Sequence, residues 1–189
     1  SRAYLSLGTS MTMGIHSEQY LYSRAFRTLS SPIAGSYTLE ALLSSGGLCI
    51  AWFRDRLSGM DPADGPIEPR LEELAAGVPA GARGVQFLPY LTSAETPYWD
   101  ANARGSFVGF SDTHGVPELY RALLEGLALE ERVSLKRVEK ATGTPVERLV
   151  VMGGGTKSPL FNQILADALQ RPIDVCAETE TTCLGAAIL

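Results

Sequence analysis

The sequence predicts an α/β fold in which helices flank a mixed sheet, and two patterns carry this prediction. The first half of the chain holds short apolar runs joined by turn residues, which is typical of hairpins. The second half alternates helical and strand-like segments, which is typical of an α/β domain. With 189 residues, 45% of them hydrophobic, the chain is long and apolar enough to bury a core without disulfides or metals.

The first half of the chain begins with a predicted β-hairpin at residues 2–17, where two apolar runs flank the turn Gly8-Thr9-Ser10. Residues 23–29 form a candidate third strand. Helical spacing follows at Leu39, Leu42, Leu43, Ile50 and Phe53. Gly46-Gly47 interrupts this helical pattern at a cost in helix stability, so it needs a reason. A ligand packed against the helix and a close contact with another helix would explain the pair equally well.

The middle of the chain contains a short amphipathic helix at residues 70–77 and strand candidates at 84–91 and 106–110. The longest predicted helix starts at Val116 and stops at Gly143.

The C-terminal segments begin with a strand at residues 148–152 that runs into three glycines. A helix follows, with Ser158 as its N-cap and Pro159 at its first position. A short strand at 172–176 and a last helix in "ETTCLGAAIL" (residues 180–189) complete the pattern.

Composition excludes several classes of function. The net charge is −5 and no basic block occurs, so binding to nucleic acid or anionic membranes is not expected. No apolar run is long enough to span a bilayer, and no signal peptide is recognised, so a cytoplasmic location is expected. Cys49, Cys176 and Cys183 are widely spaced in apolar surroundings, which predicts buried, reduced thiols rather than a zinc site.

Both ends of the sequence carry patterned secondary structure. Residues 2–7 already read as a strand, and the sequence stops inside the apolar helical pattern "LGAAIL". Domains usually end in polar, frayed segments, so we expect the chain to be a piece of a larger protein.

Two glycine turns are candidate ligand sites. Gly153-Gly154-Gly155 lies between a strand and a helix, where a ligand can approach the backbone and unpaired N–H groups. It lacks the GKS or GKT of a Walker A loop and does not match GxGxxG, and a tight turn without a ligand explains it as well. The N–H groups and hydroxyls of Gly8-Thr9-Ser10 could cradle phosphate, although a plain hairpin loop is the simpler interpretation.

Other polar and aromatic residues receive structural interpretations. In "ETPYWDANARG", we interpret Tyr98 and Trp99 as aromatic side chains that pin a loop, and we leave the role of Arg104 open. His114 is expected to be solvated or to cap a turn, and Asp167 to be a charge on a helix face.

Taken together, these segments resemble the C-terminal domain of the FGGY carbohydrate kinases, within the actin-like, sugar-kinase and Hsp70 ATPase superfamily. Gly105–Glu125 resembles the second signature of the family, with Phe110 in place of the usual aliphatic residue. "LPYLTSAETPYWDANARG" resembles a family loop, in which Ser93-Ala94-Glu95 replaces Gly-Glu-Arg. "YLSLGTS", "GGGTKSPLFNQILADALQRPI" and "ETTCLGAAIL" resemble its second phosphate loop, its adenosine motif and its last helix.

The resemblance implies a ribonuclease H-like, actin-like ATPase domain over residues 1–189, with ATP in a cleft shared with an N-terminal sugar-binding domain that this chain lacks. It implies that Gly8 and Thr9 touch the terminal phosphates and that Gly47 lies against the ribose or a phosphate. It also implies that Gly154 and Gly155 flank the adenine and that Ser158 lies near its amino edge.

The same resemblance implies that this chain has no catalytic residue and no metal ligand, because the family's catalytic aspartate lies in the N-terminal domain. The full-length protein would use ATP and Mg²⁺ to phosphorylate a pentulose such as xylulose or ribulose, or a related polyol. "TPYWD" leans toward the xylulokinase-like members. The isolated chain is expected to be inactive, and a homodimer is left open.

Two alternatives stay open from sequence. The chain could be an actin-like or Hsp70-like ATPase switch, which polymerisation or peptide-binding assays would reveal. It could also be a non-catalytic interaction module that keeps the fold without nucleotide, which titration with ATP or ADP would reveal.

Overall fold

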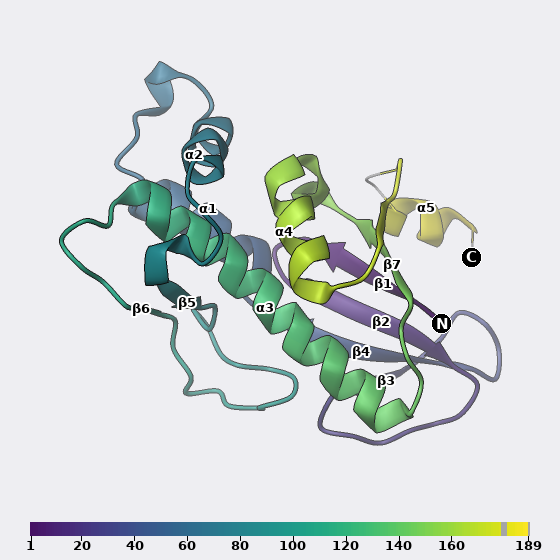
Figure 1. Cartoon of the computed structure of the whole chain (residues 1–189). Coiled ribbons are helices and arrows are strands. Elements are labelled where there is room, and N and C mark those ends of the chain that lie inside the picture. The colour runs from purple at the N-terminus through teal and green to yellow at the C-terminus, as the bar shows by residue number, and fades with distance from the viewer. Residues whose placement is uncertain (179–180, 189) are drawn as a thin grey trace.

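A mixed six-stranded sheet forms the centre of the computed structural model, which describes residues 1–178 and 181–188 (Figure 1). Across the sheet, the strands stand in the order β3 (Arg27–Ser30), β4 (Tyr37–Leu43), β2 (Met11–Ser17), β1 (Arg2–Leu7), β7 (Arg148–Met152) and β8 (Ile173–Val175). The first four pair antiparallel, whereas β7 runs parallel to β1 and β8 runs parallel to β7. The predicted mixed sheet is confirmed.

The sheet is built on the β1–β2 hairpin. Its strands pair from Tyr4 opposite Gly14 to Leu7 opposite Met11, and the pairing encloses the turn at residues 8–10. Leu5 and Leu7 are buried on alternate positions of β1, because successive side chains of a strand point to opposite faces. The parallel strand β7 adds to the other edge of β1, so the hairpin turn and the end of β7 reach the same edge of the sheet.

The predicted helix across residues 39–53 is wrong in its first part. Residues 37–43 form strand β4, which pairs with β2 over seven positions. Leu39, Ala41 and Leu43 are buried at every second residue, which is the period of a strand. Leu42, which supported the helical spacing, lies on the other face. Helix α1 begins only at Gly46 and ends at Arg56, so the glycine pair starts a helix and does not interrupt one.

The third strand is shorter than expected. Residues 23–29 were the candidate, whereas β3 covers Arg27–Ser30. Ser23 and Phe26 instead form an isolated bridge that closes a tight turn before the strand.

Helices cover the sheet and extend beyond it (Figure 1). They are α2 (Ile67–Ala76), α3 (Val116–Thr142), α4 (Pro159–Leu169) and α5 (Thr181–Ile188), with 3₁₀ turns at Pro62–Asp64 (η1), Ala82–Gly84 (η2) and Gly154–Lys157 (η3). The long helix α3 crosses the sheet diagonally in Figure 1 and packs against α2 and α4. A separate antiparallel pair, β5 (Gln86–Leu88) and β6 (Ser106–Val108), lies beside α3.

The other predicted helices are confirmed, although the one expected at residues 70–77 begins earlier, since α2 covers Ile67–Ala76. Helix α3 ends at Thr142, and its C-cap is Gly143, whose φ of 67° is the left-handed conformation that favours glycine. Helix α4 has Ser158 as its N-cap and Pro159 at its first position. Of the predicted last helix, residues 181–188 are helical, and Glu180 and Leu189 lie outside the described residues.

The cysteine prediction holds only in part. The three thiols are free, but only Cys49 is buried, while Cys176 is half-buried and Cys183 is exposed. Helix α5 ends the described chain and buries none of its side chains, which is why the apolar surroundings of Cys183 in sequence did not translate into burial. Within the described residues, no helix is both long and apolar enough to cross a membrane.

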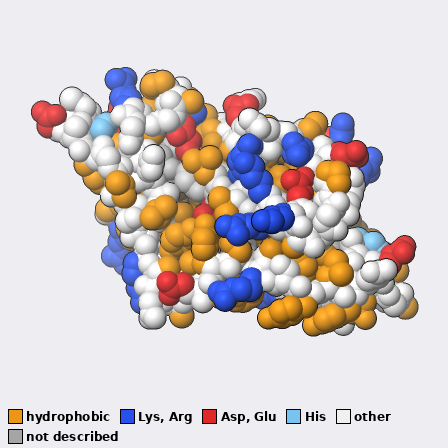
Figure 2. Space-filling view, turned by 60° about the horizontal axis from the view of Figure 1, so that its bottom comes forward, with side chains coloured by type: hydrophobic (Ala, Val, Ile, Leu, Met, Phe, Trp, Pro, Cys, Tyr) orange, Lys and Arg blue, Asp and Glu red, His pale blue; other side chains and the backbone are white. Residues whose placement is uncertain are grey.

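The surface is not uniformly polar. On the face that Figure 2 shows, hydrophobic side chains gather in patches beside a group of Lys and Arg side chains. Large exposed hydrophobic residues include Leu88, Val108 and Phe110, which belong to β5, to β6 and to the residues just after β6. Apolar surface is therefore exposed around the small sheet.

Candidate functional site

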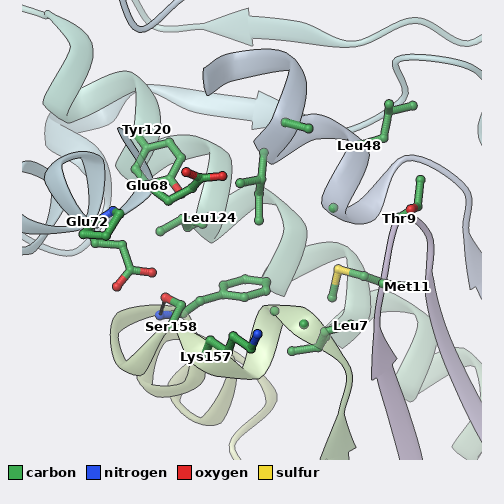
Figure 3. Close-up of a pocket in the computed structure, with 18 residues that line it drawn as sticks. Leu7, Thr9, Met11, Leu48, Glu68, Glu72, Tyr120, Leu124, Lys157 and Ser158 are labelled. Atoms are coloured by element: carbon green, nitrogen blue, oxygen red, sulfur yellow. Dashed lines mark hydrogen bonds between the residues drawn. The ribbon is translucent and has the colours of Figure 1, made fainter. Parts of the chain in front are cut away.

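A cavity of about 720 Å³ opens where the β1–β2 turn, the start of α1, helices α2 and α3, and the turn before α4 come together (Figure 3). This volume lies within the range of small-molecule binding sites. The lining residues are Leu7, Gly8, Thr9, Met11, Gly47, Leu48, Ile50, Ala51, Glu68, Pro69, Glu72, Tyr120, Leu124, Gly154, Gly155, Lys157, Ser158 and Phe161.

All six residues expected at a ligand line this one cavity. They are Gly8, Thr9, Gly47, Gly154, Gly155 and Ser158. They come from the hairpin turn, the first turn of α1 and the glycine turn before α4, which are far apart in sequence. The fold therefore brings the three glycine segments to one place, while their contacts with a nucleotide stay a prediction.

The hairpin turn and α1 are held together by their backbones. The N–H of Gly47 donates to the carbonyl of Gly8 at 2.9 Å, and the N–H of Leu48 donates to the carbonyl of Thr9 at 3.0 Å. A Cβ at position 47 would lie 2.4 Å from the Gly8 oxygen, and one at Gly46 would lie 2.8 Å from the Met11 nitrogen. Close approach to the hairpin, rather than a ligand or another helix, thus requires this glycine pair.

The glycine turn after β7 has two residues that packing requires and one that packing leaves free. Gly153 has a φ of 94°, and its Cβ would lie 2.9 Å from the Leu7 oxygen. A Cβ at Gly155 would lie 2.8 Å from that of Leu7. Around Gly154, in contrast, a Cβ would meet nothing within 4 Å. Packing against β1 therefore explains Gly153 and Gly155, whereas Gly154 faces open space at the cavity.

Ser158 links this turn to helix α4. Its Oγ accepts a hydrogen bond of 3.0 Å from the N–H of Phe161, so it satisfies one of the unpaired N–H groups at the helix start. Its hydroxyl hydrogen is still available to donate to a ligand. The preceding Lys157 is exposed and lines the cavity, and it is the one cation among the lining residues.

An acidic and phenolic group lines the opposite side of the cavity. In Figure 3, Glu68, Glu72 and Tyr120 lie on one side and Thr9 and Met11 on the other. The two glutamates stand four residues apart on α2, so they lie on one face of that helix. The remaining lining is mostly apolar. The cavity thus has two ends separated by apolar walls. Glu68 and Glu72 place carboxylates at one end, and the hairpin turn places the Thr9 hydroxyl and backbone groups at the other.

Tyr120 is nearly fully buried, with 2% of its surface exposed. Burial raises the pKa of its phenol, and the carboxylates of Glu72 and Glu68 raise that pKa further. Its hydroxyl is therefore held neutral, as a hydrogen-bond donor or acceptor, close to two negative charges.

Sequence reasoning missed these three residues. The i, i+4 spacing of Glu68 and Glu72 was visible, and Glu72 lay in the predicted amphipathic helix at residues 70–77, whereas Glu68 lay before it, because α2 begins at Ile67. That pattern is shared by most solvent-exposed helices, so it gave no reason to single them out. Only the packing of α2 against α3 brings them to Tyr120.

The aromatic loop after β5 lies outside the cavity, and its interpretation as a pinned loop is confirmed. The indole N–H of Trp99 donates to the Arg24 carbonyl at 2.8 Å, and the Arg24 side chain donates to the Tyr98 carbonyl at 2.8 Å. Arg104, whose role was open, donates to the carbonyls of Ala101 and Ala103. It therefore holds the loop.

The two remaining polar candidates are also structural. Nδ1 of His114 accepts from the N–H of Ser111 at 2.9 Å, which caps the turn before α3. Asp167 is exposed on α4, where it accepts from the Gln163 side chain at 2.9 Å.

A divalent metal finds no ligand set in this part of the protein. Across residues 1–178 and 181–188, no group of three or more His, Cys, Asp or Glu side chains could hold a metal ion. No role at a metal is assigned to the residues of the cavity.

The chain resembles proteins of one family over nearly its whole length. Residues 3–189 match the model of the FGGY family of carbohydrate kinases, C-terminal domain. The glycerol kinase of Gloeobacter violaceus is 36% identical over 151 residues, which cover 80% of this chain and 29% of that protein. Glycerol kinase 2 of Saccharolobus solfataricus is 36% identical over 175 residues, which cover 93% of this chain and 34% of that protein.

Solved structures share the fold. The ligand-bound xylulose kinase of Lactobacillus acidophilus aligns with a TM-score of 0.85 at 30% identity, over 99% of this chain and 37% of that one. The glycerol kinase of Plasmodium falciparum, solved with ADP, aligns with a TM-score of 0.82 at 25% identity, over 98% of this chain and 37% of that one. The chain thus spans about a third of the length of these relatives.

Proposed function

Because the chain belongs to the FGGY family of carbohydrate kinases, we propose that it is the ATP-binding domain of a kinase that phosphorylates a hydroxyl of a small polyol or sugar. One observation carries the proposal: three glycine segments that are distant in sequence line one cavity of nucleotide size. A flat base needs close approach to backbone, and Gly154, where an added Cβ would meet nothing within 4 Å, permits that approach.

The charges of the cavity give the nucleotide a direction. Phosphates are repelled by Glu68 and Glu72, so they belong at the end where Gly8 and Thr9 lie. The base then lies beside Gly154 and Ser158, against apolar walls. This orientation agrees with the roles that the family resemblance implies for these residues.

Chemistry requires more than this chain. Phosphoryl transfer depends on bringing nucleophile, metal and phosphate together. Within residues 1–178 and 181–188, no group of three or more His, Cys, Asp or Glu side chains could hold a metal ion, and the two carboxylates that line the cavity, Glu68 and Glu72, lie on the side away from Thr9 in Figure 3. An N-terminal domain would supply these groups and most of the sugar pocket, so the isolated chain is proposed to lack kinase activity. The cytoplasm is the proposed compartment.

Two acceptor substrates are favoured by different observations. Glycerol is favoured by the curated relatives, because the glycerol kinases of Gloeobacter violaceus and Saccharolobus solfataricus are both 36% identical to this chain. Xylulose is favoured by the solved xylulose kinases of Lactobacillus acidophilus and Rhodospirillum rubrum, which align with TM-scores of 0.85 and 0.83, and by the "TPYWD" loop at residues 96–100.

A coupled assay of ADP release by the full-length protein tests the proposal, with glycerol, xylulose, ribulose and gluconate as acceptors. We expect Mg-ATP turnover that depends on one of these acceptors, and none from the isolated chain. Turnover without any acceptor would favour an ATPase switch instead. No binding of ATP or ADP by the full-length protein would favour the interaction module.

A further inference from the structure

We propose that Ser45 is a positioning residue for phosphoryl transfer: bonded to Thr92, it fixes the start of α1, which in turn orients the hairpin turn at residues 8–10. This inference rests on the proposed function, in which that turn lies at the phosphate end of the cavity. Neither Ser45 nor Thr92 is among the described residues that line the cavity, so both would act through the turn and not on the nucleotide itself.

The hairpin turn and the start of α1 form the first link. An α-helix leaves its first N–H groups without partners inside the helix. In α1, two of these groups find partners in the turn, since Gly47 N–H donates to the Gly8 carbonyl at 2.9 Å and Leu48 N–H to the Thr9 carbonyl at 3.0 Å. Figure 3 shows Thr9 and Leu48 at the same end of the cavity. The start of α1 therefore fixes the direction of both carbonyls.

The same two peptide units leave their N–H groups for a ligand. In a planar trans peptide the N–H points opposite to the carbonyl, so the N–H groups of Thr9 and Ser10 point away from α1. Within residues 1–178 and 181–188, neither group donates a hydrogen bond. Successive N–H groups of a turn can hold an anion. A shift of the start of α1 would therefore turn the two donors that are proposed to face the phosphates.

Ser45 is the second link. It occupies the N-cap position of α1 and is 0% exposed. A serine at an N-cap commonly accepts from an N–H of its own helix, but across residues 45–56, all of which the structure describes, its side chain accepts no such bond. Its Oγ instead lies 2.8 Å from Thr92 Oγ1 and accepts from the Thr92 N–H at 3.3 Å. The serine hydroxyl thus ties α1 to the loop after β5, while the hairpin turn caps the helix.

The loop that begins near Thr92 is anchored to the central sheet. Thr92 Oγ1 also lies 3.2 Å from the Oγ of Ser44, which precedes Ser45. Further along the loop, Thr96 Oγ1 accepts from the Leu42 N–H at 2.7 Å and donates to the Leu42 carbonyl at 3.2 Å. Leu42 belongs to β4, which pairs with β2. Ser45 therefore transmits the anchorage of this loop to the start of α1.

A change in the direction of the turn is expected to act on the rate more than on nucleotide affinity. Phosphoryl transfer depends on positioning, and donors aimed at charge that develops in the transition state contribute to kcat. Contacts with the base and ribose are made elsewhere in the cavity and contribute to binding. Loss of the bonds between Ser45 and Thr92 should therefore lower kcat and leave the KM for ATP nearly unchanged, as expected for an interaction realised in the transition state.

Steady-state kinetics of the full-length protein, with the acceptor that supports turnover, test the proposal. Ser45→Ala is expected to lower kcat about three- to tenfold, the effect of losing one neutral hydrogen bond or two weak ones. Thr92→Val removes the partner hydroxyl and should lower kcat as well, whereas Thr92→Ser keeps that hydroxyl and should retain the wild-type kcat. The double variant with Ser45→Ala and Thr92→Val is expected to lose no more than Ser45→Ala alone, because both changes remove the same contact.

Thr28→Val is the matched control, because Thr28 Oγ1 donates to the Leu21 carbonyl from β3, a strand that contributes none of the described lining residues. It removes a structural hydrogen bond and is expected to keep the wild-type kcat, measured below the unfolding temperature of every variant. A wild-type kcat in Ser45→Ala, or an equal loss in Thr28→Val, would overturn the positioning role and leave the nucleotide site intact. If the wild-type protein shows no acceptor-dependent turnover of Mg-ATP, the proposed function itself is wrong, and the positioning role falls with it.

Discussion

The backbone N–H of Gly47 donates a hydrogen bond of 2.9 Å to the carbonyl of Gly8, which joins the start of α1 to the hairpin turn. We expect Gly47→Ala to lower the free energy of unfolding by about 1–3 kcal/mol, the usual cost of overpacking. The added methyl would lie 2.4 Å from the Gly8 oxygen, and neither backbone segment can yield without breaking this bond. Urea unfolding measures the effect, and stability equal to wild type would show that α1 moves freely relative to the turn.

Gly154 offers the complementary test, because packing does not require it. A Cβ there meets nothing within 4 Å, so Gly154→Ala is expected to change stability by less than about 0.5 kcal/mol. The methyl would project beside the cavity, so ATP affinity of the full-length protein is expected to fall roughly tenfold, a cost typical of overpacking.

Gly185→Ala is the control for Gly154→Ala. A Cβ at position 185 would also meet nothing within 4 Å, but this position lies on α5, which contributes no lining residue. The substitution is therefore expected to leave ATP affinity unchanged. Equal affinity of wild type and Gly154→Ala in calorimetric titration would place the ligand away from the glycine turn.

The sequence was most informative where one local signal decided the structure. Local backbone chemistry alone predicts the N-cap at Ser158, the proline at the first helical position and the helix stop at Gly143. The structure confirms all three. Residues 39–43 were misread because the same leucines fit a helical and an alternating pattern. Pairing with β2 decides between them, and that pairing is a long-range contact.

The site could be assembled from sequence only in part. Glycine signals led to Gly8, Gly47 and Gly154, because missing side chains mark close backbone approach. Glu72 and Tyr120 carry no such mark, since a glutamate and a tyrosine on helices are common. They become recognisable only when α2 and α3 pack side by side. The part of the site that sequence could not predict is therefore the part that depends on tertiary packing.

Ser158 has two proposed roles that substitutions can separate. Ser158→Ala removes the oxygen that accepts from Phe161 and is expected to cost about 1 kcal/mol of stability. Ser158→Asp keeps an N-cap acceptor, so stability should return to near wild type. Its charge would join Glu72 at the base end and should weaken ATP binding. Thermal unfolding and ATP titration of both variants check this, and wild-type affinity in Ser158→Asp would argue against a base beside this residue.

Glu131 predicts an unusual pH dependence of stability. Its side chain is buried on α3, and burial together with the nearby Glu130 raises the pKa of its carboxyl to about 8. Between its ordinary value of 4.5 and about 8, the folded protein holds this proton more tightly than the unfolded chain does. The contribution of this group to stability is therefore full below pH 4.5 and is lost as pH rises through 8.

Glu131→Gln removes that titration without changing size. We expect its Tm at pH 9 to exceed that of wild type by at least about 2–4 °C, the shift that 1 kcal/mol gives in a domain of this size. The difference should shrink at pH 5. Glu73→Gln, at an exposed position, should track wild type at both pH values. A Tm difference that does not depend on pH would contradict the raised pKa.

Hydrogen exchange of the full-length protein, with and without Mg-ADP, tests the central claim most directly, because it reports where the nucleotide lies. Protection is predicted at the amides of residues 8–10 and 153–158, the two turns that follow the adjacent strands β1 and β7 and contribute lining residues to the cavity. Exchange at the β5–β6 sheet should not change, since that sheet contributes no lining residue. Protection confined to regions outside the cavity, with both turns exchanging as before, would contradict the assignment of this cavity as the nucleotide site.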